Sequence, residues 1–148
     1  MKNIRKIFAV LFFGLLSFGA VSESPYVFNE YKVYTGRLEN FCKDAAVLLK
    51  LENTSQKVIT SFDLYICVCD ENGENPFEGS DTLVSELTAR IEPGQNYNMA
   101  VSLDSFLKDG IEESLHVKKV YLRLVRFEDG SVWKDAHGIY GYGEELWP

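Results

Sequence analysis

Residues 45–69 read AAVLLKLENTSQKVITSFDLYICVC, and this stretch decides the fold. Apolar side chains recur at every second position in both of its halves. These positions are Ala45, Val47, Leu49 and Leu51 in the first half, and Phe62, Leu64, Ile66 and Val68 in the second. Because side chains two residues apart on an extended chain point to one face, each half predicts a β-strand with one buried face. The turn-forming residues 53–57 separate the two strands, which we place at residues 45–52 and 62–69.

Five further segments on either side of this pair carry strand signals. They are residues 26–34, 83–91, 96–103, 117–127 and 131–133. In residues 117–127 the inner face is expected to hold Val120, Leu122 and Leu124. Asp129-Gly130 follows this strand directly and predicts a two-residue hairpin, because a type I′ turn needs positive φ at both central positions.

No segment shows a sustained helical period. Residues 104–108 predict a single helical turn, with Asp104 as its N-cap and Gly110 closing it. Seven short strands at intervals of about 8–12 residues predict an all-β fold, an antiparallel immunoglobulin-like β-sandwich, although periodicity alone does not separate a sandwich from a barrel. Residues 136–148 form an aromatic, glycine-rich tail that either adds an edge strand or stays outside the sheets.

Residues 1–22 have the features of a secretory signal peptide. Cationic side chains come first, and an apolar run at residues 7–16 follows that is too short to span a bilayer, which needs about 20 residues. Small residues predict cleavage after Ser22; cleavage after Ala20 and retention as a membrane anchor are the alternatives. We therefore expect an exported protein in the periplasm, at the cell surface or outside the cell, which meets the membrane only during export. Residues 23–148 would be its single domain.

The chain after Ser22 is strongly acidic. All three basic residues of the signal peptide and none of the acids leave with it, so 12 basic and 22 acidic residues remain, a net charge of −10. Nucleic acids and anionic lipid surfaces require a basic footprint. We therefore expect no nucleic-acid partner.

The three cysteines, Cys42, Cys67 and Cys69, leave two arrangements open. One is a disulfide from Cys42 to Cys67 or Cys69, which requires that the strands near them be neighbours. The other is three buried thiols, because a free cysteine behaves as a small hydrophobic residue. The two histidines, His116 and His137, lack the spacing of metal ligands.

Residues 70–82 form a polar loop that bears on metal binding. Asp70, Asn72 and Asp81 are the candidate cation ligands, in a pattern that partly matches a calcium loop. The match fails where an EF-hand needs glycine at its sixth position and glutamate at its twelfth, because these are Asn75 and Asp81 here. An acidic β-turn without a metal is the alternative.

Aromatic side chains are the other candidate binding groups. The tail supplies Tyr140, Tyr142 and Trp147, and the first strand is rich in tyrosine and phenylalanine. Such rings could hold a protein or peptide partner at an edge strand or a loop face. The alternative is that they close the ends of the sandwich, and Trp133 is expected in the core.

Several turn and core segments resemble the FxLYD-like group of small bacterial exported domains. They are Leu49-x-Leu51-x-Asn53-x-Ser55, Phe62-Asp63-Leu64-Tyr65 leading into Asp70-Glu71-Asn72-Gly73, Ile91-Glu92-Pro93-Gly94, and Val120-Tyr121 through Phe127-Glu128-Asp129-Gly130-Ser131-Val132-Trp133. The resemblance covers about residues 44–134 and implies an immunoglobulin-like sandwich in a secreted or surface-attached protein. The chain departs from the group's pattern at Cys69, where the motif has tyrosine before Asp70. The group has no catalytic residues to transfer.

No nucleophile or cofactor motif is present in the sequence, so we expect neither an enzyme nor a cofactor. The expected function is a non-catalytic interaction or adhesion-type module of the bacterial envelope. The alternative is a protein that binds a small ligand or a divalent cation through residues 70–82. Fold class cannot choose between them, because sandwiches host many functions.

Overall fold

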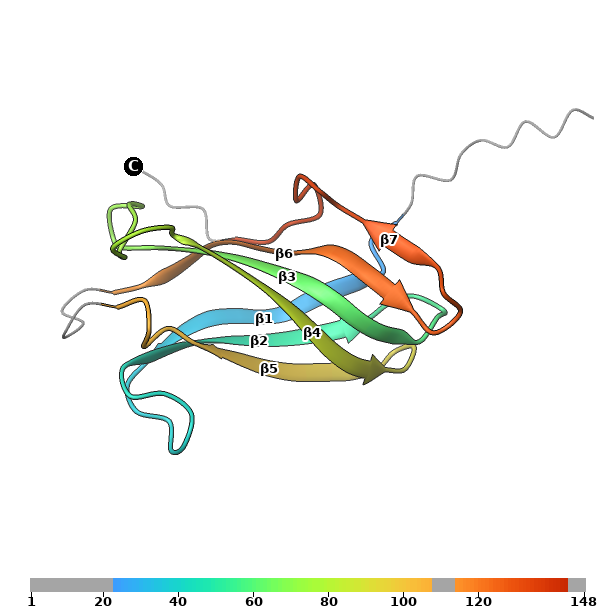
Figure 1. Ribbon diagram of the computed structural model, residues 1–148, viewed down its shortest axis with the longest axis horizontal. Helices are drawn as coiled ribbons and strands as arrows, with labels where there is room; N and C mark the ends of the chain where they lie inside the picture. Colours follow the sequence, from blue (N-terminus) through green and yellow to red (C-terminus); the bar gives the residue numbers. More distant parts are fainter. Residues whose placement is uncertain (1–22, 108–113, 144–148) are drawn as a thin grey trace, which may run out of the picture.

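The computed structural model describes residues 23–107 and 114–143, and these form a sandwich of two antiparallel sheets (Figure 1). The strands are β1 (Tyr26–Thr35), β2 (Ala45–Asn53), β3 (Ile59–Cys69), β4 (Thr82–Ile91), β5 (Asn96–Ser102), β6 (His116–Phe127) and β7 (Val132–Lys134). One sheet has the order β1-β2-β5 and the other the order β4-β3-β6-β7. The predicted all-β immunoglobulin-like sandwich is therefore confirmed.

The predicted strands agree with the observed ones to within three residues at each end. The agreement follows from burial, because inward side chains at alternate positions reach the space between the sheets. The largest fully buried side chains come from both sheets and from the segment after β5: Tyr26, Phe62, Leu51, Ile59, Leu64, Ile66, Ile91, Leu103, Leu122, Val47, Val68 and Val117. Trp133 is buried as well, in agreement with its prediction as a core residue.

The expected inner face of β6 is wrong at one position. Val120 and Leu122 are buried, but Leu124 is only half-buried and Val125 takes its place in the core. The cause is an irregularity in the pairing with β3, where Leu64 faces Leu122 and Asp63 faces Leu124. The extra residue on β6 reverses the alternation, and a sequence pattern does not show such a bulge.

The segment after β5 makes a single turn, in which the Leu103 oxygen accepts the N–H groups of Phe106 at 2.9 Å and Leu107 at 3.2 Å. Residues 104–107 form a turn, and Gly110 lies outside the described residues. The Asp104 carboxylate does not cap this turn. Instead it accepts the backbone N–H groups of Lys43, Asp44 and Ala45, and these hydrogen bonds hold the pKa of Asp104 below its ordinary value.

A buried hydrogen bond joins the two sheets near the β6 bulge. The Leu122 N–H donates to the phenolic oxygen of Tyr26 at 3.0 Å. The tyrosine therefore supplies the acceptor for a buried backbone donor of β6. Burial raises the pKa of Tyr26.

The predicted signal peptide, residues 1–22, lies outside the described residues. No helix within residues 23–107 and 114–143 is long and apolar enough to cross a bilayer.

Candidate functional site

A two-sheet sandwich has two open sides, where the edge strands of the two sheets face each other. On one side β1 lies opposite β6 and β7, and here the tail of the chain packs into the gap. The Tyr142 N–H donates to the Val120 oxygen at 2.8 Å, and the Val120 N–H donates to the Tyr142 oxygen at 2.7 Å. The tail therefore pairs with the part of β6 that the short strand β7 does not cover. It does so through a single β-bridge, whereas the sequence allowed a full edge strand.

The Tyr142 ring then fills the gap between the sheets. Its centroid lies 5.7 Å from that of Phe28, 5.9 Å from that of Tyr31 and 6.5 Å from that of Tyr26. The ring centroid of Tyr140 lies 5.6 Å from that of Trp133. Two of the three aromatic candidates thus close one side of the sandwich, and the third, Trp147, lies outside the described residues.

The turn that leads into the tail is built around Asp135. Its buried carboxylate accepts the N–H groups of Ile139 and Tyr140, and its own N–H donates to the Arg123 oxygen. Gly138 has a φ of 65°, and a Cβ there would lie 2.7 Å from the Tyr121 ring. The turn therefore needs glycine at this position, and it presses the tail against β6.

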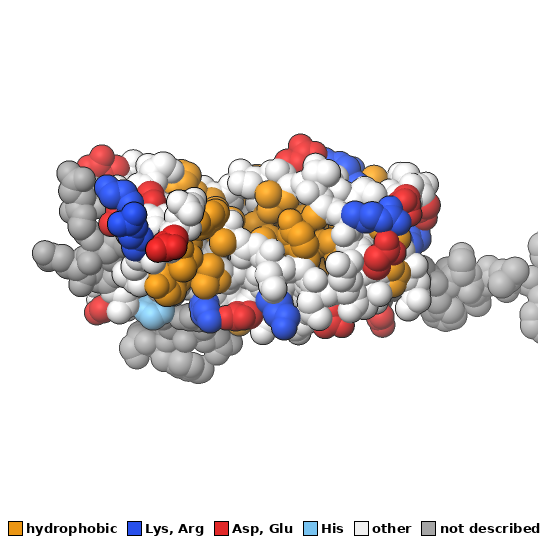
Figure 2. Space-filling model, turned by 90° about the horizontal axis from the view of Figure 1, so that it is seen from below, with side chains coloured by type: hydrophobic (Ala, Val, Ile, Leu, Met, Phe, Trp, Pro, Cys, Tyr) orange, Lys and Arg blue, Asp and Glu red, His pale blue; other side chains and the backbone are white. Residues whose placement is uncertain are grey.

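On the other side, β4 faces β5, and the described residues include no strand or tail segment that bridges to the outer edge of either strand. Figure 2 shows this face, with hydrophobic side chains in its middle and charged side chains around them. Two adjoining cavities of about 320 and 280 Å³ lie at the start of β4 and share Thr82 and Phe106. Two large apolar side chains at this groove are exposed, Val84 at 52% and Phe106 at 41% of their surface.

The residues that line this groove come mainly from β4 and from the segments that flank it. The smaller cavity is lined by Thr82, Leu83, Val84, Ser85, Val101 and Phe106; the larger adds Phe77, Glu78, Gly79, Ser80, Ser105 and Leu107. Phe77 and Phe106 pack against each other with centroids 5.9 Å apart, which fixes an apolar wall. Sequence reasoning missed this groove, because its walls meet only when the two sheets stack.

The candidate cation ligands in residues 70–82 are placed as turn-forming groups. Asp70 Oδ1 accepts the N–H groups of Asn72 and Glu74, which makes a compact turn. Asp81 accepts hydrogen bonds from the Cys67 thiol and the Thr82 hydroxyl. No group of three His, Cys, Asp or Glu side chains in the described part of the chain is arranged to hold a metal ion.

No disulfide joins any two of the three cysteines, and all three are buried. Cys67 Sγ lies 3.3 Å from Asp81 Oδ2, and Cys42 Sγ lies 3.6 Å from the Gly36 oxygen. Burial, followed by the Asp81 hydrogen bond, raises the pKa of Cys67 to about 11. This thiol is therefore protonated, and unreactive as a nucleophile, at neutral pH.

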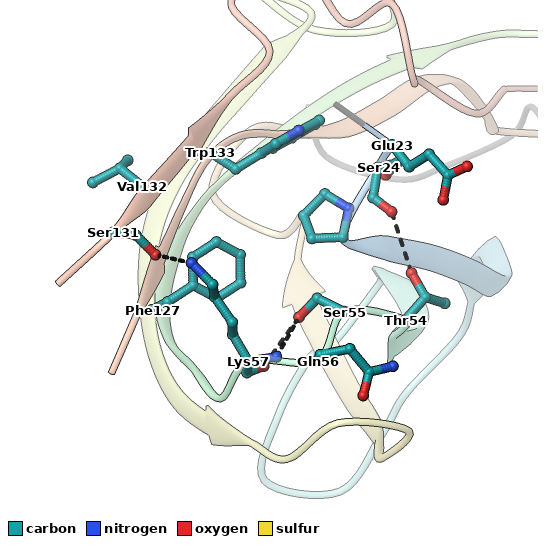
Figure 3. A pocket seen from close by; sticks show the side chains of 11 residues that line it. Glu23, Ser24, Thr54, Ser55, Gln56, Lys57, Phe127, Ser131, Val132 and Trp133 are labelled. Atoms are coloured by element: carbon teal, nitrogen blue, oxygen red, sulfur yellow. Dashed lines mark hydrogen bonds between the residues drawn. The ribbon is translucent and has the colours of Figure 1, made fainter. Parts of the chain in front are cut away.

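A third cavity, of about 510 Å³, lies at the end of the sandwich where β1 begins (Figure 3). Phe127 and Trp133 form an apolar wall, and the Lys57 ammonium lies 5.5 Å from the Phe127 ring centroid. The polar rim is already paired: Lys57 Nζ contacts Ser131 Oγ at 2.8 Å and Asp129 Oδ2 at 2.9 Å. Lys57 is therefore already held by two neighbouring side chains at this cavity.

Comparison with known proteins shows the fold alone. No family model matches the chain, and no curated protein matches it. A solved structure of a hypothetical protein from Peptoclostridium difficile 630 is similar, with a TM-score of 0.54 and 15% sequence identity over 76% of this chain and 87% of that chain. The resemblance to the FxLYD-like group stays a prediction.

Proposed function

We propose that this chain is an exported, non-catalytic interaction module of the bacterial envelope that binds an extended segment of a partner protein on its β4–β5 side. The asymmetry of the sandwich carries the proposal. On the β1–β6 side the chain supplies its own segment, which bridges an edge strand and inserts a Tyr142 ring. On the β4–β5 side the described residues leave the groove and its two edge strands open.

The β4 edge has backbone groups suited to strand addition. The Val68 N–H donates to the Asp81 oxygen, so Asp81 points its backbone groups toward β3. In an antiparallel ladder these groups alternate in direction, which places those of Val84 and Glu86 on the outer edge. An extended peptide paired there would add a fifth strand to the sheet, the mode of recognition called β-augmentation.

The other edges are less suitable. β1 has an irregularity at Phe28/Glu30, whereas the pairing of β4 is regular from Thr82 to Thr88 and its irregularity falls beyond Val84 and Glu86. β7 has only three residues. On β5 none of the seven residues is charged, but the groove follows β4 and takes only Val101 from β5.

The groove also gives a peptide apolar surface to bury. Phe106 and Val84 are both exposed, and they line the smaller cavity together with the partly buried Val101. Burial of apolar area contributes about 25 cal/mol per Å², and an edge without such a surface would offer only backbone hydrogen bonds. The combination of a free edge and an apolar groove favours a polypeptide over a small ligand.

A library of random dodecapeptides displayed on phage tests the proposal. We expect enriched peptides whose binding slows hydrogen exchange at the Val84 and Glu86 amides. Val84→Pro should abolish binding by removing the outward N–H, and it should leave the fold intact because this N–H takes no part in the β3 ladder. Val84→Ala is the matched control, since it shortens the same side chain and keeps the N–H. Failure to enrich peptides, or equal binding by the proline and alanine variants, would contradict strand addition at β4.

A further inference from the structure

Resting on the proposed function, we infer that the partner segment carries an aromatic residue opposite Ser85 and inserts its ring between β4 and β5. The place of Ser85 in its strand is the first observation. Ser85 pairs with Leu64, which is buried in the core, so its side chain points into the space between the sheets. The next residues on this face of β4 are Leu83 and Leu87. A small side chain between two large ones leaves room at the open side of the sandwich.

The room beside Ser85 is the smaller of the two cavities, of about 280 Å³. Its opposite wall is Val101, which pairs with the buried Val47 and therefore points inward from the other sheet. Phe106, 41% exposed, lines the cavity from the segment after β5. An apolar cavity of about 150 Å³ holds a benzene molecule. The cavity at Ser85 therefore has the size and the apolar walls to take an aromatic ring.

The β1–β6 side of the same sandwich shows how such a gap is filled. There the Tyr142 backbone pairs with the edge of β6 at Val120, and the Tyr142 ring enters between the sheets and lies 5.7 Å from the Phe28 ring. The β4–β5 side has the same two features, an edge strand and an apolar gap behind it. The described residues supply no segment to the β4 edge, so a ring at this side has to come from the partner.

The alternation of an antiparallel ladder decides which partner residue carries the ring. The outward backbone groups of β4 belong to Val84 and Glu86, whose side chains lie on the outer face of the sheet, opposite to that of Ser85. Partner residues that are hydrogen-bonded to these two would point to the outer face as well. The partner residue between them lies opposite Ser85 in a non-hydrogen-bonded pair, where side chains come closest. Its ring would enter the cavity, whereas a ring opposite Leu83 would meet a large side chain.

Peptides enriched from the displayed dodecapeptide library are the probes for this inference. We expect the enriched peptides to share a phenylalanine, tyrosine or tryptophan. Replacing that residue with alanine should weaken binding at least about tenfold, because the ring no longer buries its apolar surface. Replacing either of its two neighbours with alanine should weaken binding less than about threefold, because these side chains point away from the cavity and alanine keeps the backbone hydrogen bonds.

Ser85→Leu tests the cavity itself, because the larger side chain fills it. It should weaken binding of the aromatic peptides about tenfold. The loss should be smaller for the alanine-substituted peptides, which have no ring to displace, and this coupling places the ring at Ser85. Thr88→Leu is the matched control, since it replaces a hydroxyl side chain with the same leucine at an exposed position of β4. It should leave the affinity within a factor of about two.

Phe106→Ala gives a second, independent test, because it removes a wall of the cavity that belongs to neither sheet. It should weaken binding at least about threefold. Enriched peptides that require the Val84 N–H but share no aromatic residue, or that bind Ser85→Leu or Phe106→Ala as tightly as wild type, would overturn this inference and leave the proposed function standing. Aromatic peptides that bind Val84→Pro as well as Val84→Ala would overturn both, since a ring would then hold them without an added strand.

Discussion

At the scale of single residues, Asn53 holds two turns of the sandwich together. Its side chain is 0% exposed. The amide Nδ2 donates to the Lys57 oxygen at 2.8 Å and to the Ile91 oxygen at 2.9 Å, and Oδ1 accepts the Ser55 N–H. One side chain therefore links the β2–β3 turn to the end of β4.

We expect Asn53→Asp to destabilise the protein by about 3 kcal/mol at neutral pH, because a carboxylate oxygen would face two buried carbonyl oxygens. Urea unfolding followed by circular dichroism measures this. Gln56→Glu adds the same charge to the same turn at an exposed position, and we expect it to change stability by less than about 0.5 kcal/mol. Equal effects of the two substitutions would show that charge, rather than the Asn53 hydrogen bonds, governs the turn.

At the scale of elements, the tail closes one side of the sandwich by packing the Tyr142 ring between the two sheets. Tyr142→Ala removes a half-buried ring that contacts Phe28 and Tyr31, and we expect a loss of about 2 kcal/mol, below the range for a fully buried aromatic ring. Hydrogen exchange at the Val120 amide, which donates to Tyr142, should accelerate with it. Ile139→Ala is the control in the same tail, because that side chain is 79% exposed. If Tyr142→Ala lowered the free energy of unfolding by no more than Ile139→Ala does, the contacts of the tail would not stabilise the sandwich.

The strands could be predicted from the sequence because their signal is local. The alternation at Val47, Leu49 and Leu51 arises within one segment, and it is the same whichever strand pairs with that segment. The prediction failed at Leu124, where a bulge that depends on the pairing of β6 with β3 reverses the faces. Local patterns thus predict elements, but they carry little information about how the elements pair.

The sites were harder to predict because their contacts are distant in sequence. Asp104 looked like a helix N-cap because its local sequence fits one, yet its carboxylate accepts N–H groups at residues 43–45. The groove joins Phe77 to Phe106 and Leu83 to Val101, which no short-range pattern relates. The sequence analysis singled out residues 70–82, but as a loop with candidate cation ligands, and the place of residues 77–80 beside the groove depends on the fold.

At the scale of the whole molecule, the lowered carboxylate pKa values predict loss of stability in acid. The pKa values of Asp104, Glu128 and Glu30 lie below their ordinary values, and that of Asp129 falls to about 2. The unfolded chain then binds more protons than the folded one, so this stability is present above about pH 4.5 and is lost as the pH falls toward 2. Urea midpoints at constant ionic strength should fall across this range. Asp104→Asn should show a smaller fall, and equal falls in the two proteins would contradict a role for that carboxylate.

In alkaline solution stability is expected to fall as the pH rises, and the cause is a buried thiol rather than a carboxylate. Cys67 has an ordinary pKa of 9.0 that rises to about 11 in the fold, mainly because its thiolate would be buried. Between these values the unfolded chain has released the proton and the folded chain has not, so stability falls as the pH rises from 9 toward 11. Tyr26 and Tyr121 add to the loss only above pH 10, their ordinary pKa. Urea midpoints of Cys67→Ser should therefore fall less from pH 9 to pH 10 than those of the wild type. A serine variant that loses stability from pH 9 in parallel with the wild type would show that the protonation of the Cys67 thiol is not linked to folding.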